Sequence, residues 1–466
     1  MIRLFYSLAL LICLVSTSKA QIGIGAEPHP SAALDLNATD KAFYPPRVTT
    51  AQRIAIENPQ AGAFVYDTDK GRMYLYDGQN WYPLTIETNG AHPLIDRFAS
   101  DGKQQDYFGH SVAIDGDYAI VSAVAHSSFK GQAYIFVREG NTWKEQAVLS
   151  FPAGQSGDYF GMSVSISGNY AVVGANRRTV QGVNTEPNYV QGIAVVYVRS
   201  GSTWTQQAVL SGSDGALYDG FGTSVCIKGT DIIVGAPYKN QNIGQAYIFS
   251  LQNSQWTEQA ILRNEQGTSG ASFGLSVSIS GDHAIVGEPY GFTDELGEAY
   301  IYYRSGNSWI MQSRLMKSNS NPDENFGNSV LITDKYAVVS SPSEAYNSGT
   351  IIIYQRNGIN WNEYTTHLIF SGVPHLNFGK SISISDDYLL VSGQIDDSSI
   401  EFDKGRVYLF KIEEFNTTLV KQFSNTSPPN SNFGHSVGIS GSSFIIGEYY
   451  FDSGRGKVAF GTVDNF

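Results

Sequence analysis

Residues 221–237 have the sequence FGTSVCIKGTDIIVGAP, in which a Phe-Gly pair is followed by an alternating run, a Gly-centred turn and a denser apolar run. Alternation with a period of two is typical of a β-strand with one buried face. A tight turn followed by a second apolar run predicts a β-hairpin. This stretch therefore indicates two antiparallel strands.

The same pattern recurs seven times along the chain. Each Phe-Gly pair is followed, fourteen residues after its Phe, by a Gly or a Ser, and this constant offset indicates a constant strand-turn-strand geometry. We expect the Phe side chains to pack between neighbouring sheets and the Gly to allow a positive φ or a close backbone approach. The seven structural phenylalanines are Phe108, Phe160, Phe221, Phe273, Phe326, Phe378 and Phe433.

The rest of each repeat predicts two more strands. A Gly opens an apolar segment such as GQAYIF at residues 131–136, and twelve residues after that Gly a Trp starts a further strand, at Trp143, Trp204, Trp256, Trp309 and Trp361. Four antiparallel strands per repeat make a propeller blade, and radial stacking of blades buries both faces of every sheet. The sequence predicts an all-β fold, a seven-bladed β-propeller of four-stranded antiparallel blades over residues 91–466.

The last repeat supplies only three strands before Phe466. Residues 93–98, which precede the first Phe-Gly pair, resemble the fourth-strand segments of other repeats, such as residues 146–149. We therefore expect residues 93–98 to complete the seventh blade by pairing with the C-terminal strands.

Two segments precede the propeller. Residues 1–20 contain Arg3, an apolar run and small residues before a cleavage site near Ala20, a pattern that predicts a secretory signal peptide. Residues 21–90 predict a small mixed module with a short helix and a hairpin. Its segments GIG at 23–25, TTAQR at 49–53 and VYDT at 65–68 resemble an N-terminal segment of bacterial secreted and fibre-like proteins.

The composition limits the possible partners. The net charge is −13, and it becomes −15 once Arg3 and Lys19 leave with the signal segment, so a nucleic-acid partner is not expected. No apolar run approaches the length of a membrane span. The other cysteine, Cys13, leaves with the signal segment, so Cys226 has no cysteine partner. We expect Cys226 to be a buried strand residue. The predicted location is secreted or at the cell surface.

Phe-Gly, Ser-Val and the Gly-Ala-Pro triplet at residues 235–237 resemble the FG-GAP repeat of integrin α-subunit propellers and of their bacterial relatives. The resemblance implies a propeller that supports adhesion and ligand recognition. In that family several first-hairpin loops hold calcium through an Asp-rich run. Here these turns have two or three residues with at most two carboxylates, whereas calcium prefers six to eight oxygens. We predict no metal and no cofactor.

No motif predicts catalysis. The eight histidines show no metal-binding spacing, and no nucleophile elbow or phosphate loop occurs. His110 and His435 directly follow Phe-Gly pairs, at a variable position that is expected to be peripheral. The prediction is that the chain is not an enzyme and has no catalytic residue, although a triad assembled only in space stays possible.

The loops after the second strands vary most and are rich in side chains that suit interfaces. They are expected to share one face of the disc, the ligand face of the resembled family. Our first hypothesis is a secreted or cell-surface module that binds an extracellular protein or glycan there. The ligand-binding candidates are Arg177, Arg178, Tyr238, Tyr290, Tyr449 and Tyr450.

Two alternatives stay open. One is an enzyme that acts on polysaccharide with the acids Asp294, Glu295 or Glu288 at the channel mouth, which requires carboxylates about 5–10 Å apart. The other is a structural component of a surface assembly, docked through residues 21–90. For the aromatic loop residues themselves, the other interpretation is that they only pack onto the loops below them.

Overall fold

The chain divides into two compact units, residues 1–91 and 92–466. The computed structural model describes residues 22–24, 34–36, 45–70, 72–76, 78, 81–83, 94–178, 191–290, 297–317, 324–343, 349–367, 377–393, 405–413, 416–424 and 431–463. The predicted signal segment 1–20 lies outside these residues. None of the described helices is long and apolar enough to cross a membrane.

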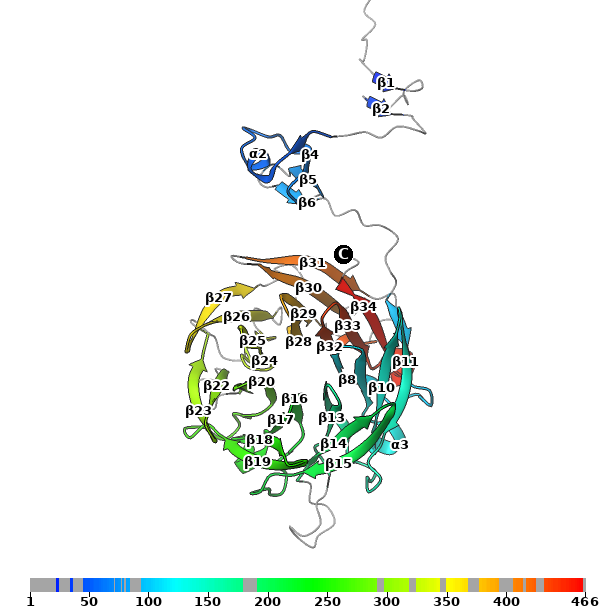
Figure 1. The fold of residues 1–466 in the computed structure, drawn as a ribbon, viewed down its shortest axis with the longest axis vertical. Coiled ribbons are helices and arrows are strands. Elements are labelled where there is room, and N and C mark those ends of the chain that lie inside the picture. The colour runs from blue at the N-terminus through cyan, green and yellow to red at the C-terminus, as the bar shows by residue number, and fades with distance from the viewer. Residues whose placement is uncertain are drawn as a thin grey trace, which may run out of the picture. The chain divides into compact units, whose positions relative to one another are not determined.

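The described part of the second unit contains seven four-stranded antiparallel sheets, which confirms the predicted fold class (Figure 1). Blades one to three are formed by β8 (Phe108–Asp115), β9 (Tyr118–Ala123), β10 (Gln132–Glu139) and β11 (Thr142–Leu149); β12 (Phe160–Ser167), β13 (Tyr170–Ala175), β14 (Ile193–Ser200) and β15 (Thr203–Leu210); and β16 (Ser224–Lys228), β17 (Asp231–Ala236), β18 (Gln245–Gln252) and β19 (Gln255–Leu262).

Blades four to six follow the same order. They are formed by β20 (Ser276–Ser280), β21 (His283–Glu288), β22 (Glu298–Ser305) and β23 (Ser308–Leu315); β24 (Val330–Ile332), β25 (Tyr336–Ser341), β26 (Thr350–Asn357) and β27 (Asn360–His367); and β28 (Phe378–Ser385), β29 (Tyr388–Gly393), β30 (Arg406–Glu413) and β31 (Asn416–Ser424).

The seventh blade joins both ends of the unit. It consists of β32 (Phe433–Ser440), β33 (Ser443–Glu448), β34 (Lys457–Thr462) and β7 (Ile95–Arg97). β7 pairs antiparallel with β34, Ile95 opposite Phe460 and Arg97 opposite Val458. Lys457 Nζ also lies 2.8 Å from the Asp96 carboxylate. The segment before the first repeat thus covers the edge of the last strand.

The first strands of successive blades contact one another all the way round, and β32 contacts β8. Figure 1 shows these first strands innermost and the fourth strands at the rim. Serines on the innermost strands bridge neighbouring blades. The Ser165 hydroxyl accepts a hydrogen bond from Ile227 N–H at 3.0 Å, and Ser163 donates to the Gly222 carbonyl at 2.9 Å. The serines that alternate with apolar residues in the first strands therefore join neighbouring blades by hydrogen bonds.

The Phe-Gly pairs anchor each blade to the one before it. All seven phenylalanines are at most 1% exposed. The residue before each Phe and the Gly after it both have a positive φ. A Cβ on Gly222, whose φ is +90°, would lie 2.3 Å from the Ile193 carbonyl oxygen of the preceding blade. Only Gly therefore allows this close approach.

The first-hairpin turns donate backbone hydrogen bonds to side chains of the preceding blade. Gly168 N–H donates to the Asp115 carboxylate at 2.7 Å, and Gly229 N–H donates to Ser167 at 3.1 Å. Cys226, on β16, is partly buried and packs against the core between blades three and four, and its Sγ lies 4.0 Å from the Ile279 carbonyl oxygen. No group of three or more His, Cys, Asp or Glu side chains in the described residues could hold a metal ion.

The first unit contains a mixed sheet of β3 (Arg47–Val48), β4 (Phe64–Asp67), β5 (Arg72–Tyr76) and β6 (Trp81–Pro83), with helix α2 (Thr50–Ile54), and a separate parallel pair of β1 (Ile22–Ile24) and β2 (Leu34–Leu36). Thr49 and Gln52 form a capping box at the start of α2.

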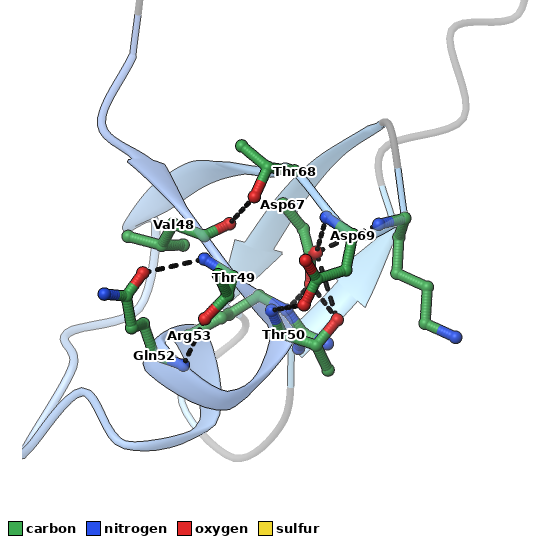
Figure 2. A network of polar contacts seen from close by, with 9 residues as sticks. Val48, Thr49, Thr50, Gln52, Arg53, Asp67, Thr68 and Asp69 are labelled. Carbon is green, nitrogen blue, oxygen red and sulfur yellow. Dashed lines mark hydrogen bonds and ion pairs between the residues drawn. The ribbon is translucent and has the colours of Figure 1, made fainter.

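Asp67 organises this sheet and helix, as Figure 2 shows. Its carboxylate accepts hydrogen bonds from the Thr50 hydroxyl, from Arg53 Nε at 2.9 Å and from the Asp69 and Lys70 N–H groups. Burial raises the pKa of Asp67, but Arg53 and the other donors outweigh it and the pKa falls below its ordinary value. The guanidinium of Arg53 also lies 3.8 Å from the centre of the Tyr74 ring. The TTAQR and VYDT segments thus meet at one buried ion pair.

Candidate functional site

Four of the six predicted ligand-binding residues occupy one position of the repeat, seventeen residues after the Phe. The N–H of each donates to the carbonyl two residues before that Phe, within its own blade. The four residues are Arg177, Tyr238, Tyr290 and Tyr450, which are all exposed. They therefore stand at the same level around one end of the blades, formed by the second-to-third-strand and fourth-to-first-strand loops.

An aromatic row crosses blades seven, one and two at this end. We define it as Tyr450, Tyr449, Tyr107, Phe129 and Tyr159. Successive rings are in contact: Tyr107 lies 6.0 Å from Tyr450, 5.5 Å from Tyr449 and 6.4 Å from Phe129, and Phe129 stacks on Tyr159 at 4.9 Å between ring centres. The guanidinium of Arg177 lies 4.7 Å from the Tyr159 ring centre and extends the row.

A repeated turn holds this row in place. In α3 (His126–Phe129), Ser127, Ser128 and Phe129 all have left-handed backbone conformations, with φ of 51°, 61° and 63°. The Phe129 carbonyl accepts a hydrogen bond from Tyr159 N–H at 2.9 Å. Left-handed turns of non-Gly residues are rare and persist only where the surroundings fix them. Equivalent turns occur in α4 (Lys239–Asn242) and α6 (Phe451–Gly454).

Two histidines lie at the inner end of the row. His110 and His435 sit on β8 and β32, with ring centres 5.0 Å apart, and Tyr449 lies 4.4 Å from His435. The expectation that they are peripheral is wrong, because these strands are innermost and adjacent. Burial lowers the pKa of His110 to about 4, and burial with the nearby His110 and Lys380 lowers that of His435 well below its ordinary value. Both imidazoles are neutral at pH 7.

Tyr238 and Tyr290 form a separate patch on blades three and four. Their side chains are 42% and 43% exposed. Burial, and to a lesser extent Tyr238, raises the pKa of Tyr290. No described ring contact joins this patch to the aromatic row. The predicted tyrosines are therefore divided between two places on the loop end.

Arg178 has a different role from Arg177. Its guanidinium lies 3.1 Å from the Asp158 carboxylate, and this side chain is mostly buried. The same clasp recurs as Asp106 with His126 at 3.0 Å and Asp219 with Lys239 at 2.8 Å. In each case an acid two residues before the Phe meets a basic residue eighteen residues after it. The structure thus places Arg178 in a repeated intrablade contact.

The acids of the catalytic alternative do not gather in the described residues. Asp294 and Glu295 lie outside them. Glu288 is 6% exposed at the end of β21, opposite Glu298, and both its oxygens accept from Asn264 Nδ2, at 3.1 and 3.2 Å. Burial raises the pKa of Glu288 to about 7, although the bond from Asn264 opposes this. Glu288 is therefore a buried carboxyl that faces a second acid, Glu298, and is hydrogen-bonded by Asn264.

Replacing Glu288 with Gln should stabilise the protein above neutral pH. A raised folded-state pKa means that the folded state holds a proton which the unfolded chain releases, so wild-type stability falls as the pH rises from about 4.5 to 7. The shift corresponds to about 3 kcal/mol. Thermal melts from pH 5 to 8 should show E288Q gaining stability over wild type as the pH rises.

The matched control is Glu448→Gln, at the equivalent position of blade seven. There the facing residue is Lys457, 3.4 Å away, instead of a second acid. E448Q should destabilise the protein at neutral pH, because it leaves a buried ammonium with one partner fewer. A gain in stability for E448Q, or none for E288Q at pH 8, would contradict the assignment.

Two family models match the chain. Residues 21–94 match the phage tail like trimerisation region, and residues 98–136, 143–190, 204–249 and 256–302 match the FG-GAP repeat. These segments overlap the first unit and blades one to four, without β14 and β23.

Similar curated proteins are integrin α-subunits. Human integrin alpha-D is 26% identical over 46% of this chain and 19% of its own length, human integrin alpha-X is 26% identical over 48% and 19%, and mouse integrin alpha-M is 24% identical over 42% and 18%. The chain thus spans about a fifth of the length of these relatives.

Among solved structures, Sqt1 of Saccharomyces cerevisiae is similar with a TM-score of 0.43 and 8% identity, over 77% of this chain and 83% of that chain. The repeat pattern, the closed ring and the matches agree on one identification. The chain is an integrin-α-like FG-GAP repeat protein, with a phage tail-like trimerisation region at its N-terminal side.

Proposed function

We propose that this protein is an exported binding module, released or held at the cell surface, that recognises an extracellular protein or glycan through the aromatic row. The proposal deepens what an integrin-like FG-GAP propeller suggests, which is a module for binding or adhesion. The signal-like segment 1–20 supports export.

The observation that carries the proposal is the row itself. Rings from three blades touch in sequence, and two of them, Phe129 and Tyr450, are exposed, at 36% and 44%. The other three rings of the row are partly buried. Tyrosine and phenylalanine offer large contact areas with few rotatable bonds, so little entropy is lost when they bind. The left-handed turns fix the rings before a partner arrives, which reduces the cost of association.

Binding is favoured over catalysis for a chemical reason. The two groups with the most strongly lowered pKa near the row, His110 and His435, are neutral and lie side by side, with no described carboxylate in contact with them. Glu288 is hydrogen-bonded by Asn264 within its own surroundings. The candidate residues that remain are the aromatic ones and Arg177, which are typical of interfaces.

We further propose that residues 21–94 join three chains, as the name of the matching family model suggests. Three propellers in one assembly would bind a surface with three aromatic rows at once. Multivalent attachment strengthens weak individual contacts through a high effective concentration. This combines the adhesive reading with the alternative of a component of a surface assembly.

The test is a binding screen against arrayed glycans and extracellular matrix proteins. The double variant Phe129→Ala, Tyr450→Ala should lose about tenfold or more in affinity for whatever the wild-type protein binds. The control is Tyr218→Ala, which removes a tyrosine that is 58% exposed and outside the row. Equal binding by wild type and the double variant would rule out the row as the recognition surface.

A further inference from the structure

The end of the blades opposite the aromatic row, where the first-hairpin turns lie, has an unusual junction between blades three and four. At three other junctions the first residue of a blade's second strand is aromatic and packs on the Trp of the next blade. The ring centres of these pairs are 6.3 Å apart for Tyr118 and Trp204, 5.6 Å for Tyr170 and Trp256, and 5.8 Å for His283 and Trp361. An aromatic side chain therefore fills these junctions.

The same three tryptophans are also tied to the preceding blade by a hydrogen bond. Each indole N–H donates to a Gln on the fourth strand of that blade, from Trp204 to Gln146 at 3.1 Å, from Trp256 to Gln207 at 2.8 Å and from Trp361 to Gln312 at 3.0 Å. Packing and hydrogen bonding thus close the junctions together.

Both closing elements are missing between blades three and four. The residue in the aromatic position is Asp231, which pairs with Arg304 at 2.6 Å. The expected Gln partner, Gln259, instead donates to the Thr257 hydroxyl at 2.8 Å and accepts from Gln252 at 3.2 Å. Among the described residues none accepts a hydrogen bond from the Trp309 indole N–H. That donor is left for a ligand or solvent.

A groove of about 240 Å³ occupies the place of the missing ring. Its lining includes Asp231, Gln252, Gln259, Asn307 and Trp309. The guanidinium of Arg304 lies 4.7 Å from the centre of the Trp309 ring and holds this ring at the side of the groove. The groove brings together three amide side chains, those of Gln252, Gln259 and Asn307, and one indole donor in a space lined mainly by polar atoms.

We propose that this groove binds a single neutral monosaccharide unit. Sugar hydroxyls both donate and accept hydrogen bonds, which matches an indole N–H beside amide side chains. An anionic ligand is disfavoured, because Arg304 is already paired with both Asp231 and Asp282. The site lies on the turn end of the blades, away from the aromatic row, so it would act in addition to the proposed recognition surface.

The test uses ligand-observed NMR with the full-length protein and a panel of glucose, galactose, mannose, fucose and N-acetylglucosamine. At least one sugar should bind. Asp231→Tyr, which places an aromatic residue where the three filled junctions have one, should abolish that binding. Trp309→Phe keeps a ring but removes the N–H, and it should weaken binding about fivefold, the effect of one lost hydrogen bond.

Two controls separate the possible causes. Trp204→Phe makes the same change at a filled junction and should leave sugar binding unaltered, and melting curves should show that all three variants fold. The row variant Phe129→Ala, Tyr450→Ala should also bind the sugar normally, which distinguishes this site from the proposed recognition surface. The proposal is overturned if no sugar of the panel binds, or if D231Y and W309F both bind it as wild type does.

Discussion

A chain that begins at His92 should melt as the propeller of the full-length protein does, whereas a chain that begins at Ala99 should be destabilised by about 3–5 kcal/mol. The seven residues that distinguish these chains include β7. Without it, β34 loses the backbone partners on one of its two edges, Lys457 loses the Asp96 carboxylate, and the hydrogen bond from Arg97 to the Trp143 carbonyl, at 2.6 Å, is lost.

The reason lies in the closed ring. An exposed edge on β34 would leave blade seven with three strands and would weaken its contact with blade one. Thermal and urea unfolding of the two chains measure the effect. Indistinguishable transitions for the chains beginning at His92 and at Ala99 would show that β7 is not needed for closure.

Gly222→Ala should destabilise the protein by more than about 3 kcal/mol, the second large effect. The new Cβ would meet the Ile193 carbonyl oxygen at 2.3 Å, and Gly222 has a φ of +90°, which an L-residue rarely adopts. Because the obstacle is backbone of the neighbouring blade, relief requires the two blades to separate.

Gly229→Ala is the matched control, in the hairpin turn of the same blade. Gly229 has a φ of +60°, and a Cβ there would meet nothing within 4 Å. The cost should be about 1 kcal/mol, from the backbone conformation alone. Chemical denaturation of both variants gives the comparison, and a G222A loss no larger than that of G229A would contradict the interblade role of the Phe-Gly pair.

The fold could be predicted because the determining positions recur. Phe221, Gly222 and the residue fourteen positions after the Phe serve the same geometric role in each blade, so seven weak signals reinforce one another. The four-stranded blade follows from strand periodicity and from the Trp that opens the last strand. Neither step requires knowledge of contacts between blades.

The aromatic row could not be predicted in the same way. Tyr107, Phe129 and Tyr450 come from two different loops of blade one and from blade seven, and they meet only because the ring closes. The left-handed turn that presents Phe129 has no Gly in its three left-handed positions, so the sequence carries no turn signal there. Tyr107 and Tyr159 could have been found by noting that both precede a Phe-Gly pair.

Arg178 illustrates the opposite error. An arginine in a long variable loop suggested ligand contact, but its acid partner, Asp158, lies two residues before the Phe of the same repeat. The recurrence of an acid and a base at these two positions in blades one to three was a readable signal. Comparing repeat positions by charge, as well as by hydrophobicity, would have identified the clasp.

Binding of a partner through the aromatic row, as we propose, is tested most directly by affinity measurement on the row variants. With a ligand from the glycan and matrix-protein screen, titration should give a loss of about tenfold or more for Phe129→Ala, Tyr450→Ala and an unchanged affinity for Tyr218→Ala. Unchanged affinity for the double variant, with its fold intact, would contradict the account.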